Sequence, residues 1–362
     1  MGRMAGMGCI RDIHPRTDRA SRHRHPNLPH SGLGWTRRQP ALVVVDDRDG
    51  HLFGEIQGCK IKMKLPDTFV NNIRGAFQEK GEIFLTNLPR LIEEAAQLWN
   101  LSEVQPVPNL SYNFVAFAKQ GEQDVILKIG IPNHELTSEM NALKLFNGEG
   151  ACQLLDCDEE RGFLLIERLE PGTMLADLED DDERTHIAID VIQNLILHRG
   201  KATSPTQVKF IKLSDWFGGL KDIRPQFNGG TGPIPEKLLD RVEASLPELF
   251  ADDDYLIHGD FHHYNILLSE RGWLVIDPKG VIGPVGYEIG PFMLNPWVRP
   301  MDRVQFEVQA RRRVDIFHER LGWEREKIIG WSLAHSVLSA YWDLELEPMY
   351  SVEAAEIFSR LK

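Results

Sequence analysis

The pattern of apolar and polar positions divides the chain into regions of different period. Residues 1–62 show neither a helical nor a strand period, because Arg, His, Pro and Gly are scattered among few apolar side chains. Such a segment buries too little apolar area to offset the entropy lost on ordering it. We therefore expect residues 1–62 to form a disordered extension. The alternative that translation begins at Met63 stays open.

Residues 63–168 contain segments with a helical period and segments with a strand period. A helical segment is expected over residues 67–100, where Pro89 stands at a position that suits a helix start, and a second helix over residues 135–146. Alternating apolar positions and polar turns predict strands at residues 107–110, 114–118, 125–129, 151–157 and 163–169. This mixture indicates a sheet with a few helices packed on it.

From about residue 169 the pattern becomes mainly helical. Helices are expected over residues 235–250 and from Trp331 onward. Two short apolar runs, residues 255–257 and 273–276, interrupt this pattern and are expected to be strands. Each run is followed by a group of polar residues, and these two groups are candidates for catalytic or binding residues.

Length and composition are those of a soluble globular protein that can bury a sizeable core in one or two domains; the chain has 362 residues, of which 42% are hydrophobic. No apolar run is long enough to cross a bilayer, and the N-terminus lacks the apolar core of a signal peptide. The four cysteines lack the paired C-x-x-C spacing of a zinc site. A reduced, cytoplasmic chain is therefore expected.

Charge is distributed unevenly. Residues 1–62 carry 11 basic and 6 acidic side chains, whereas the whole chain carries 41 and 54. The remaining residues are therefore strongly acidic, which argues against a nucleic-acid partner because phosphates need a basic surface. An acidic body would attract a cationic small molecule, although solubility alone is an equally good explanation.

The run LIHGDFHHYNILLSERGWLVIDPKG carries the candidate chemistry. Its first strand leads to His258 and Asp260, Asn265 follows, and its second strand ends at Asp277. One carboxylate can orient an acceptor hydroxyl and take its proton, while an amide oxygen and a second carboxylate can hold magnesium on ATP. Protein kinases use H-R-D-L-x-x-x-N followed by D-F-G. Here the Asp-to-Asn spacing is the same, so the sequence predicts phosphoryl transfer.

Three runs, HGDFHHYNIL, WLVIDPKGVIGPVGYEIGP and VILKIGIPNHELTSEMNALKLF, resemble the aminoglycoside phosphotransferase family of small-molecule kinases. The closer resemblance, from about Leu65 to the C-terminus, is to the streptomycin 6-phosphotransferase branch, the aminoglycoside/hydroxyurea resistance kinases. It implies an α+β, protein-kinase-like two-lobe fold. ATP would lie between a small antiparallel-sheet lobe, residues 63–168, and a mainly helical lobe, residues 169–362. The missing A-P-E motif and activation segment favour a small-molecule acceptor.

The same resemblance implies residues that bind ATP. Lys128 lies in an apolar strand and needs an anionic partner, because an unpaired buried charge is costly. Phosphate oxygens and a helix glutamate are natural partners; Glu135 and Glu139 both qualify, and the family pattern favours Glu139. Ser111 and Asn113 stand in the turn that would cover the phosphates, with an ordinary polar hairpin turn as the alternative.

Further roles follow from the position of each residue in the motifs. Glu167 and Leu169 lie in the connection between the lobes, where extended backbone would offer hydrogen bonds to adenine. Asp260 is implied as the catalytic base, and Asn265 and Asp277 as Mg²⁺ ligands. The expected cofactors are therefore ATP and Mg²⁺.

Two nearby features permit other interpretations. Adjacent His262 and His263 suggest zinc, but neighbouring histidines rarely face one point, so zinc is not expected. Lys279 departs from the protein-kinase pattern. Its amine could reach a phosphate or pair with a nearby carboxylate, and both interpretations stay open.

The acceptor is expected to be a cationic aminoglycoside, with streptomycin phosphorylated at its 6-hydroxyl as the case that the resemblance favours. Guanidinium groups would need carboxylates and aromatic faces, for which Glu288, Trp297, Asp343 and Glu345 are candidates. An ordinary structural role is an equal alternative for each. Hydroxyurea, a sugar, choline or homoserine are alternative acceptors. A catalytically weak nucleotide-binding scaffold is the alternative of another class.

Overall fold

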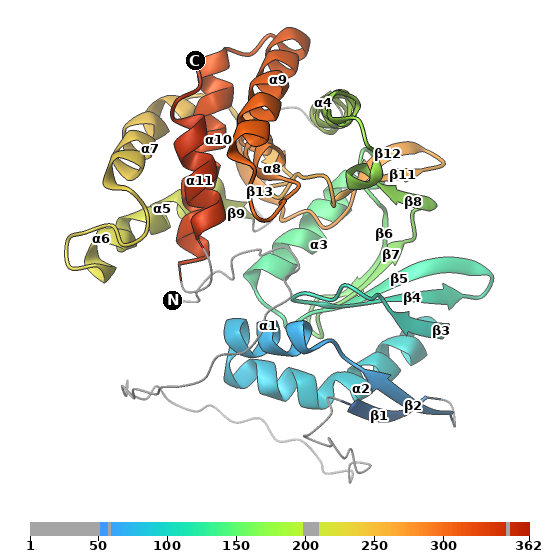
Figure 1. The fold of residues 1–362 in the computed structure, drawn as a ribbon. Helices are drawn as coiled ribbons and strands as arrows, with labels where there is room; N and C mark the ends of the chain where they lie inside the picture. Colours follow the sequence, from blue (N-terminus) through green and yellow to red (C-terminus); the bar gives the residue numbers. More distant parts are fainter. Residues whose placement is uncertain (1–50, 57–58, 198–209, 345–347) are drawn as a thin grey trace.

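The computed structural model describes residues 51–56, 59–197, 210–344 and 348–362, which form two lobes (Figure 1). The N-terminal lobe is built on a five-stranded antiparallel sheet with the order β3-β4-β5-β7-β6. Its strands are β3 (Leu101–Pro106), β4 (Phe114–Gln120), β5 (Gln123–Ile129), β6 (Leu154–Asp158) and β7 (Phe163–Glu167). Strand β5 occupies the centre of this sheet.

Helices cover both faces of this sheet because its strands alternate. In β7, Phe163 and Leu165 join the apolar core beneath the sheet, whereas Leu164 and Ile166 join a second cluster on the opposite face. The helices are α1 (Asp67–Phe77), α2 (Glu79–Trp99) and α3 (His134–Phe146). In Figure 1, α1 and α2 lie on one side of the sheet, and α3 lies on the side of the C-terminal lobe.

Two expectations for this lobe are wrong. The strand expected at residues 107–110 is a loop, and β3 ends before it, because Pro108 has no N–H with which to continue the ladder. Pro89 does not start a helix: it lies within α2, which begins at Glu79. The helical pattern was therefore correct, but the position of its first turn was not.

A hairpin that the sequence pattern did not indicate precedes α1. It consists of β1 (His51–Ile56) and β2 (Cys59–Lys64), which pair antiparallel with each other. Residues 1–50 and 57–58, the rest of the extension predicted from the sequence, lie outside the described residues. The expected domain boundaries at residues 62 and 168 stay predictions.

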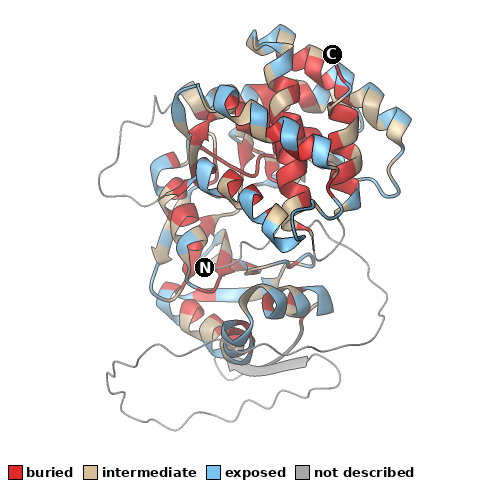
Figure 2. Ribbon diagram, turned by 90° about the vertical axis from the view of Figure 1, so that its left-hand side faces the viewer, coloured by how far each residue is buried: buried red, intermediate tan, exposed pale blue. Residues whose placement is uncertain are grey.

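The C-terminal lobe is mainly helical, with α10 at its centre. Its helices are α4 (Asp181–Leu197), α5 (Leu213–Gly218), α6 (Ile223–Gln226), α7 (Glu236–Leu249), α8 (Ile289–Leu294), α9 (Arg303–Leu321), α10 (Arg325–Trp342) and α11 (Met349–Phe358). Residues 331–340 of α10 are buried on every side, because α7, α8, α9 and α11 surround it (Figure 2). None of the described helices is long and apolar enough to cross a membrane.

Two small sheets at the junction of the lobes carry the polar loops. Their orders are β10-β13-β9 and β12-β11-β8. The strands are β8 (Pro171–Met174), β9 (Ile211–Lys212), β10 (Asp254–Ile257), β11 (Ile266–Ser269), β12 (Gly272–Val275) and β13 (Val281–Pro284). The loop from β10 to β11 and the loop from β12 to β13 contain the acidic residues expected to act, so both loops start from paired strands.

Candidate active site

Strand β5 and helix α3 bring Lys128 and Glu139 together. Leu127 and Ile129 face the core beneath the sheet, so Lys128 points to the opposite face. Its Nζ lies 2.6 Å from Oε1 of Glu139, and the two residues are only 5% and 4% exposed. Of the two glutamates considered from the sequence, Glu139 is the one that pairs with the lysine.

Asp277 accepts a second hydrogen bond from the same lysine, which joins the two lobes. Nζ of Lys128 donates to Oδ1 of Asp277, and Nζ of Lys279 lies 3.4 Å from Oδ2. Burial raises the pKa of Asp277, but the two ammonium groups outweigh burial and hold this pKa well below its usual range. Burial raises the pKa of Glu139, and Lys128 offsets only part of that effect.

The Asp-Pro-Lys-Gly turn after β12 fits closely against α3. Asp277 itself has a left-handed backbone conformation, with φ of 57°. At Gly280, φ is 62° and an added Cβ would lie 2.4 Å from the carbonyl oxygen of Ser138. The Ser138 hydroxyl donates to the carbonyl of Gly280 at 2.5 Å. The close contact with α3 therefore requires glycine at position 280.

Glu288 holds the loop that follows β10. Its carboxylate accepts hydrogen bonds from the backbone N–H of His258 at 2.5 Å and of Gly259 at 3.1 Å. Gly259 has φ of 83°, and a Cβ there would lie 2.6 Å from a methyl carbon of Val281. The carboxylate proposed from the sequence as an acceptor ligand is thus engaged with the loop itself.

The imidazole of His258 joins the two polar loops. Its Nε2 lies 2.8 Å from the carbonyl oxygen of Ile276, and its Nδ1 lies 3.1 Å from the backbone N–H of Asp260. Donation to the carbonyl and acceptance from the N–H require the neutral Nε2–H tautomer. Burial lowers the pKa of His258 to about 4, so this tautomer persists at neutral pH.

Asp260 and Asn265 form a unit at the start of β11. Nδ2 of Asn265 donates to the carbonyl oxygen of Asp260 at 3.0 Å and to its Oδ2 at 3.1 Å, which leaves the amide oxygen of Asn265 for another ligand. Burial raises the pKa of Asp260, but His262, Lys279 and His258 outweigh it, and this pKa falls to about 2. The carboxylate is therefore ionised and can only accept hydrogen bonds.

The donor set fits a magnesium–nucleotide complex. The amide oxygen of Asn265 and the carboxylate of Asp277 are hard oxygen ligands, and Mg²⁺ commonly uses one or two protein ligands plus phosphates and water. Among the described residues, no three His, Cys, Asp or Glu side chains are placed to hold a metal ion by themselves. Nε2 of His262 lies 3.4 Å from Oδ2 of Asp260, whereas the ring of His263 stacks on Phe292, so the adjacent histidines face different partners.

The other nucleotide candidates occupy the sheet side of the junction. Ser111 is exposed in the loop between β3 and β4, and its carbonyl accepts from Asn72 at 3.4 Å. Oδ1 of Asn113 lies against Gly130. Glu167 accepts hydrogen bonds from the backbone N–H of Gln153 and from Arg271. Leu169 is buried in the apolar cluster that also contains residues Ile166 and Leu274.

The acceptor candidates among the described residues contact different partners. Trp297 stacks on Tyr350, with ring centroids 4.8 Å apart. Asp343 is buried just after α10, and its charge acts on Tyr112 in the loop between β3 and β4. Glu345 lies outside the described residues.

Sequence reasoning missed a polar pair beside the acidic loop. The hydroxyl of Tyr287, in η3 (Val285–Glu288), lies 3.0 Å from Nδ1 of His335 on α10. The charge of Asp260 acts on both side chains. A histidine in the mainly apolar segment that begins at Trp331 was the available signal.

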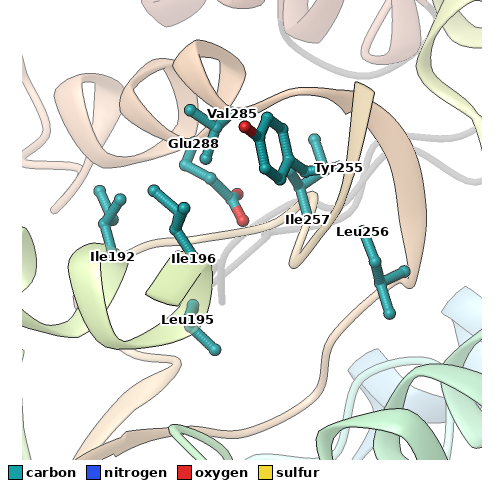
Figure 3. A pocket seen from close by; sticks show the side chains of 8 residues that line it. All are labelled: Ile192, Leu195, Ile196, Tyr255, Leu256, Ile257, Val285 and Glu288. Atoms are coloured by element: carbon teal, nitrogen blue, oxygen red, sulfur yellow. The ribbon is translucent and has the colours of Figure 1, made fainter. Parts of the chain in front are cut away.

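Glu288 also borders a small cavity outside this group. The cavity lies between α4 and β10, and Figure 3 shows the carboxylate of Glu288 among apolar side chains. Its lining includes Ile192, Tyr255 and Val285, and it includes neither Asp260 nor Asp277. The cavity therefore lies apart from the two aspartates of the candidate active site.

Buried histidines make stability depend on pH. Burial lowers the pKa of His335 to about 3, below the ordinary value of 6.5. An unfolded chain therefore takes up protons that the folded chain does not, and stability falls as the pH drops from about 6.5 toward 4. We expect His335→Asn to reduce proton uptake on unfolding at pH 5.5 by about one proton. Urea unfolding between pH 7.5 and 5 measures this uptake, and an unchanged pH slope in the variant would contradict the assignment.

The two-lobe arrangement, with a lysine–glutamate pair in the sheet lobe facing two acidic loops of the helical lobe, defines a protein-kinase-like phosphotransferase. The model of the aminoglycoside/hydroxyurea antibiotic resistance kinase family matches residues 99–346, and the chain belongs to this family. It is accordingly a phosphotransferase that acts on a hydroxyl group. The family and the fold expected from the sequence are confirmed.

Individual relatives agree with this assignment. The chain is 28% identical to a streptomycin 6-kinase of Streptomyces glaucescens over 288 residues, 78% of this chain and 92% of the relative. It is 29% identical to a hydroxyurea phosphotransferase of Kitasatospora aureofaciens over 269 residues, which are 73% of this chain and 76% of the relative. Its fold is similar to that of a mutant aminoglycoside phosphotransferase crystallised with AMP-PNP and hygromycin B, with a TM-score of 0.51 and 14% sequence identity. The superposition covers 76% of this chain and 98% of the other.

Proposed function

We propose that this enzyme transfers the terminal phosphoryl group of ATP to a hydroxyl of an aminoglycoside, with the 6-hydroxyl of streptomycin as the favoured acceptor. The observation that carries this proposal is the chain of contacts Glu139–Lys128–Asp277, placed next to the Asp260–Asn265 unit. Such a modification adds negative charge to the drug and would confer resistance. The favoured acceptor rests on the likeness to streptomycin 6-kinases.

Asp260 orients the acceptor in this proposal. Its carboxylate accepts a hydrogen bond from the acceptor hydroxyl and directs the oxygen in line with the terminal phosphorus. Asn265 keeps the carboxylate in one rotamer through its amide N–H. Because the transition state of phosphoryl transfer is loose, the proton can move to Asp260 late, so a strongly basic carboxylate is not required.

Lys128 binds phosphate oxygens in the same scheme, and Glu139 fixes the direction of its ammonium. Asn265 and Asp277 would hold Mg²⁺, which when bound neutralises charge on the phosphates. Ser111 and Asn113 are proposed to cover the phosphates from the loop between β3 and β4.

The adenine ring is proposed to contact the backbone at Glu167 and Leu169. The side chain of Glu167 is held by Gln153 and Arg271, so it supports the backbone rather than binding the base. Leu169 belongs to an apolar cluster against which Ile126, Leu267 and Ile276 are only partly buried. These apolar side chains from both lobes are suited to a flat base.

The acceptor side is proposed to include Asp343 and Trp297, with Tyr287 and His335 beside Asp260. Asp343 would attract a cationic acceptor and Trp297 would offer an aromatic face. We assign Glu288 to the support of the catalytic loop, because both of its oxygens accept backbone hydrogen bonds. The acidic balance of the chain, −13 overall, favours cationic acceptors over nucleic acid.

Hydroxyurea is the second candidate acceptor, because one relative is a hydroxyurea phosphotransferase. The same phosphate-binding residues would serve either acceptor. A catalytically weak scaffold is disfavoured, because a scaffold need not retain the motif residues, all of which are present: Lys128, Glu139, Asp260, Asn265 and Asp277.

An acceptor panel tests the proposal. Purified full-length protein is incubated with Mg-ATP and, separately, streptomycin, a 2-deoxystreptamine aminoglycoside, hydroxyurea or choline, and ADP release is measured. We expect turnover with streptomycin and phosphate on its 6-oxygen by NMR. If hydroxyurea were the one panel member that supports turnover, the proposed acceptor would be hydroxyurea and not streptomycin. Nucleotide binding without turnover on any member of the panel would overturn the antibiotic assignment.

A further inference from the structure

Lys279 is a second lysine at the junction of the lobes, and its backbone is fixed. Its N–H donates to the carbonyl of His258 at 2.7 Å, and the next residue, Gly280, packs against Ser138 of α3. Its ammonium lies 3.4 Å from Oδ2 of Asp277, and the side chain is 17% exposed. Only the side chain is therefore free to change partners.

The two lysines share one carboxylate but are not equivalent. Lys128 bonds to Oδ1 of Asp277 and also has Glu139 at 2.6 Å, so losing one partner leaves it paired. Lys279 takes Oδ2 of Asp277, and it has no other ion pair within 4 Å among the described residues. Its ammonium is therefore the group that must find a new partner when Asp277 is engaged by something else.

Binding of a divalent cation at Asp277 would force this exchange. A magnesium–oxygen bond is about 2.1 Å long, so a metal ion on Asp277 would stand within a few ångströms of the ammonium. Like charges at that distance repel strongly in a partly buried site. Asp260, Glu139 and Glu135 also act electrostatically on Lys279, so its ammonium has other negative charges nearby when it leaves Asp277.

We propose that Lys279 leaves Asp277 when the magnesium–nucleotide complex binds and donates hydrogen bonds to the terminal phosphoryl group, acting as a catalytic residue. This inference rests on the proposed function of the site. The ammonium stays protonated, and no bond to it forms or breaks. It stabilises the negative charge on the oxygens of the transferring group.

The loop between β3 and β4 gives a second reason for this role. Residues 107–113 contain no glycine, so the loop lacks the feature with which a glycine-rich loop brings backbone N–H groups close to phosphates. A lysine arriving from the opposite lobe would supply positive charge to the same oxygens. Lys128 and Lys279 would then contact the phosphates from the two sides of the junction.

The test compares two nucleotides that differ in the terminal phosphoryl group. Calorimetric titration of full-length protein with Mg-AMP-PNP and with Mg-ADP gives the ratio of the two affinities for each variant. We expect Lys279→Met to weaken AMP-PNP about 10- to 100-fold and ADP less than about 3-fold, because only AMP-PNP carries the contacted group. Lys279→Arg keeps the charge and should retain most of the ratio.

A surface lysine provides the matched control. Lys119 on β4 pairs with Asp124 at 3.7 Å, and Lys119→Met should leave both affinities unchanged. Equal weakening of both nucleotides by Lys279→Met would overturn the proposal, as it would assign the lysine to the metal site or the fold. Unchanged affinities would overturn it as well. Wild-type protein that binds both nucleotides but phosphorylates no acceptor would remove the proposed function while leaving this contact intact.

Discussion

Asp260→Asn lowers kcat for phosphoryl transfer by about 10²- to 10⁴-fold, the range that a positioned general base contributes. Asparagine has nearly the same shape and can still accept the hydrogen bond from Asn265, so the loop keeps its geometry. It cannot take a proton from the acceptor hydroxyl. We therefore expect the affinity for Mg-AMP-PNP to change by no more than a few-fold. Steady-state kinetics with the best acceptor of the panel, together with calorimetry, measure both quantities.

An aspartate on the strand that precedes this loop controls for general effects of charge. Asp254 is exposed at the start of β10, and Asp254→Asn should retain wild-type kcat. If Asp260→Asn kept more than a tenth of the wild-type kcat, the base would have to be another group. His262, whose Nε2 lies 3.4 Å from the carboxylate, would then be the first residue to replace.

The acidic loops could be predicted because their geometry is local. Asp260 and Asn265 are separated by five positions in one loop, so the spacing alone brings the carboxylate and the amide together. Asp277 follows a strand that pairs with the strand after Asn265, and strand pairing fixes its place. The alternation of side chains along β5 was enough to place Lys128 on the face opposite to Leu127 and Ile129.

Contacts between distant segments could not be predicted. Glu288 was a candidate ligand for a cationic acceptor, with a structural role as the equal alternative; it lies 30 residues after His258 and accepts that residue's N–H. The pair Tyr287–His335 joins residues 48 positions apart. Arg313 of α9 is buried against Asp181 of α4, 132 positions away, with Nη2 2.6 Å from Oδ1. Such partners depend on helix packing, which no periodicity specifies.

The N-terminal lobe illustrates a different limit, the position of element ends. The apolar period correctly indicated a helix over residues 67–100, but the structure has two helices that meet at Gln78, where φ is 51°. Proline was interpreted as a starting signal, yet α2 accommodates Pro89 in its interior. Local signals thus determine the kind of element more reliably than its ends.

Lys128→Met should cost both stability and activity, because it leaves Glu139 buried beside Asp277 without its cation. Removing one partner of a buried ion pair costs about 3 kcal/mol or more in free energy of unfolding. Burial already raises the pKa of Glu139, so protonation of that carboxylate sets a limit on the loss. We expect kcat/KM for ATP to fall about 100-fold or more, since the phosphate contact is lost as well. Urea unfolding and steady-state kinetics measure the two effects.

A double variant separates the two effects. In Lys128→Met combined with Glu139→Gln, the carboxylate that faced Lys128 is also removed, so most of the lost stability should return. Activity should not return, because neither methionine nor glutamine supplies a cation to the phosphates. Recovery of turnover together with stability would mean that Lys128 acts only through the fold. Recovery of stability alone would assign the lysine to the nucleotide, and in the nucleotide-free variant Asp277 would keep Lys279 as its cationic partner.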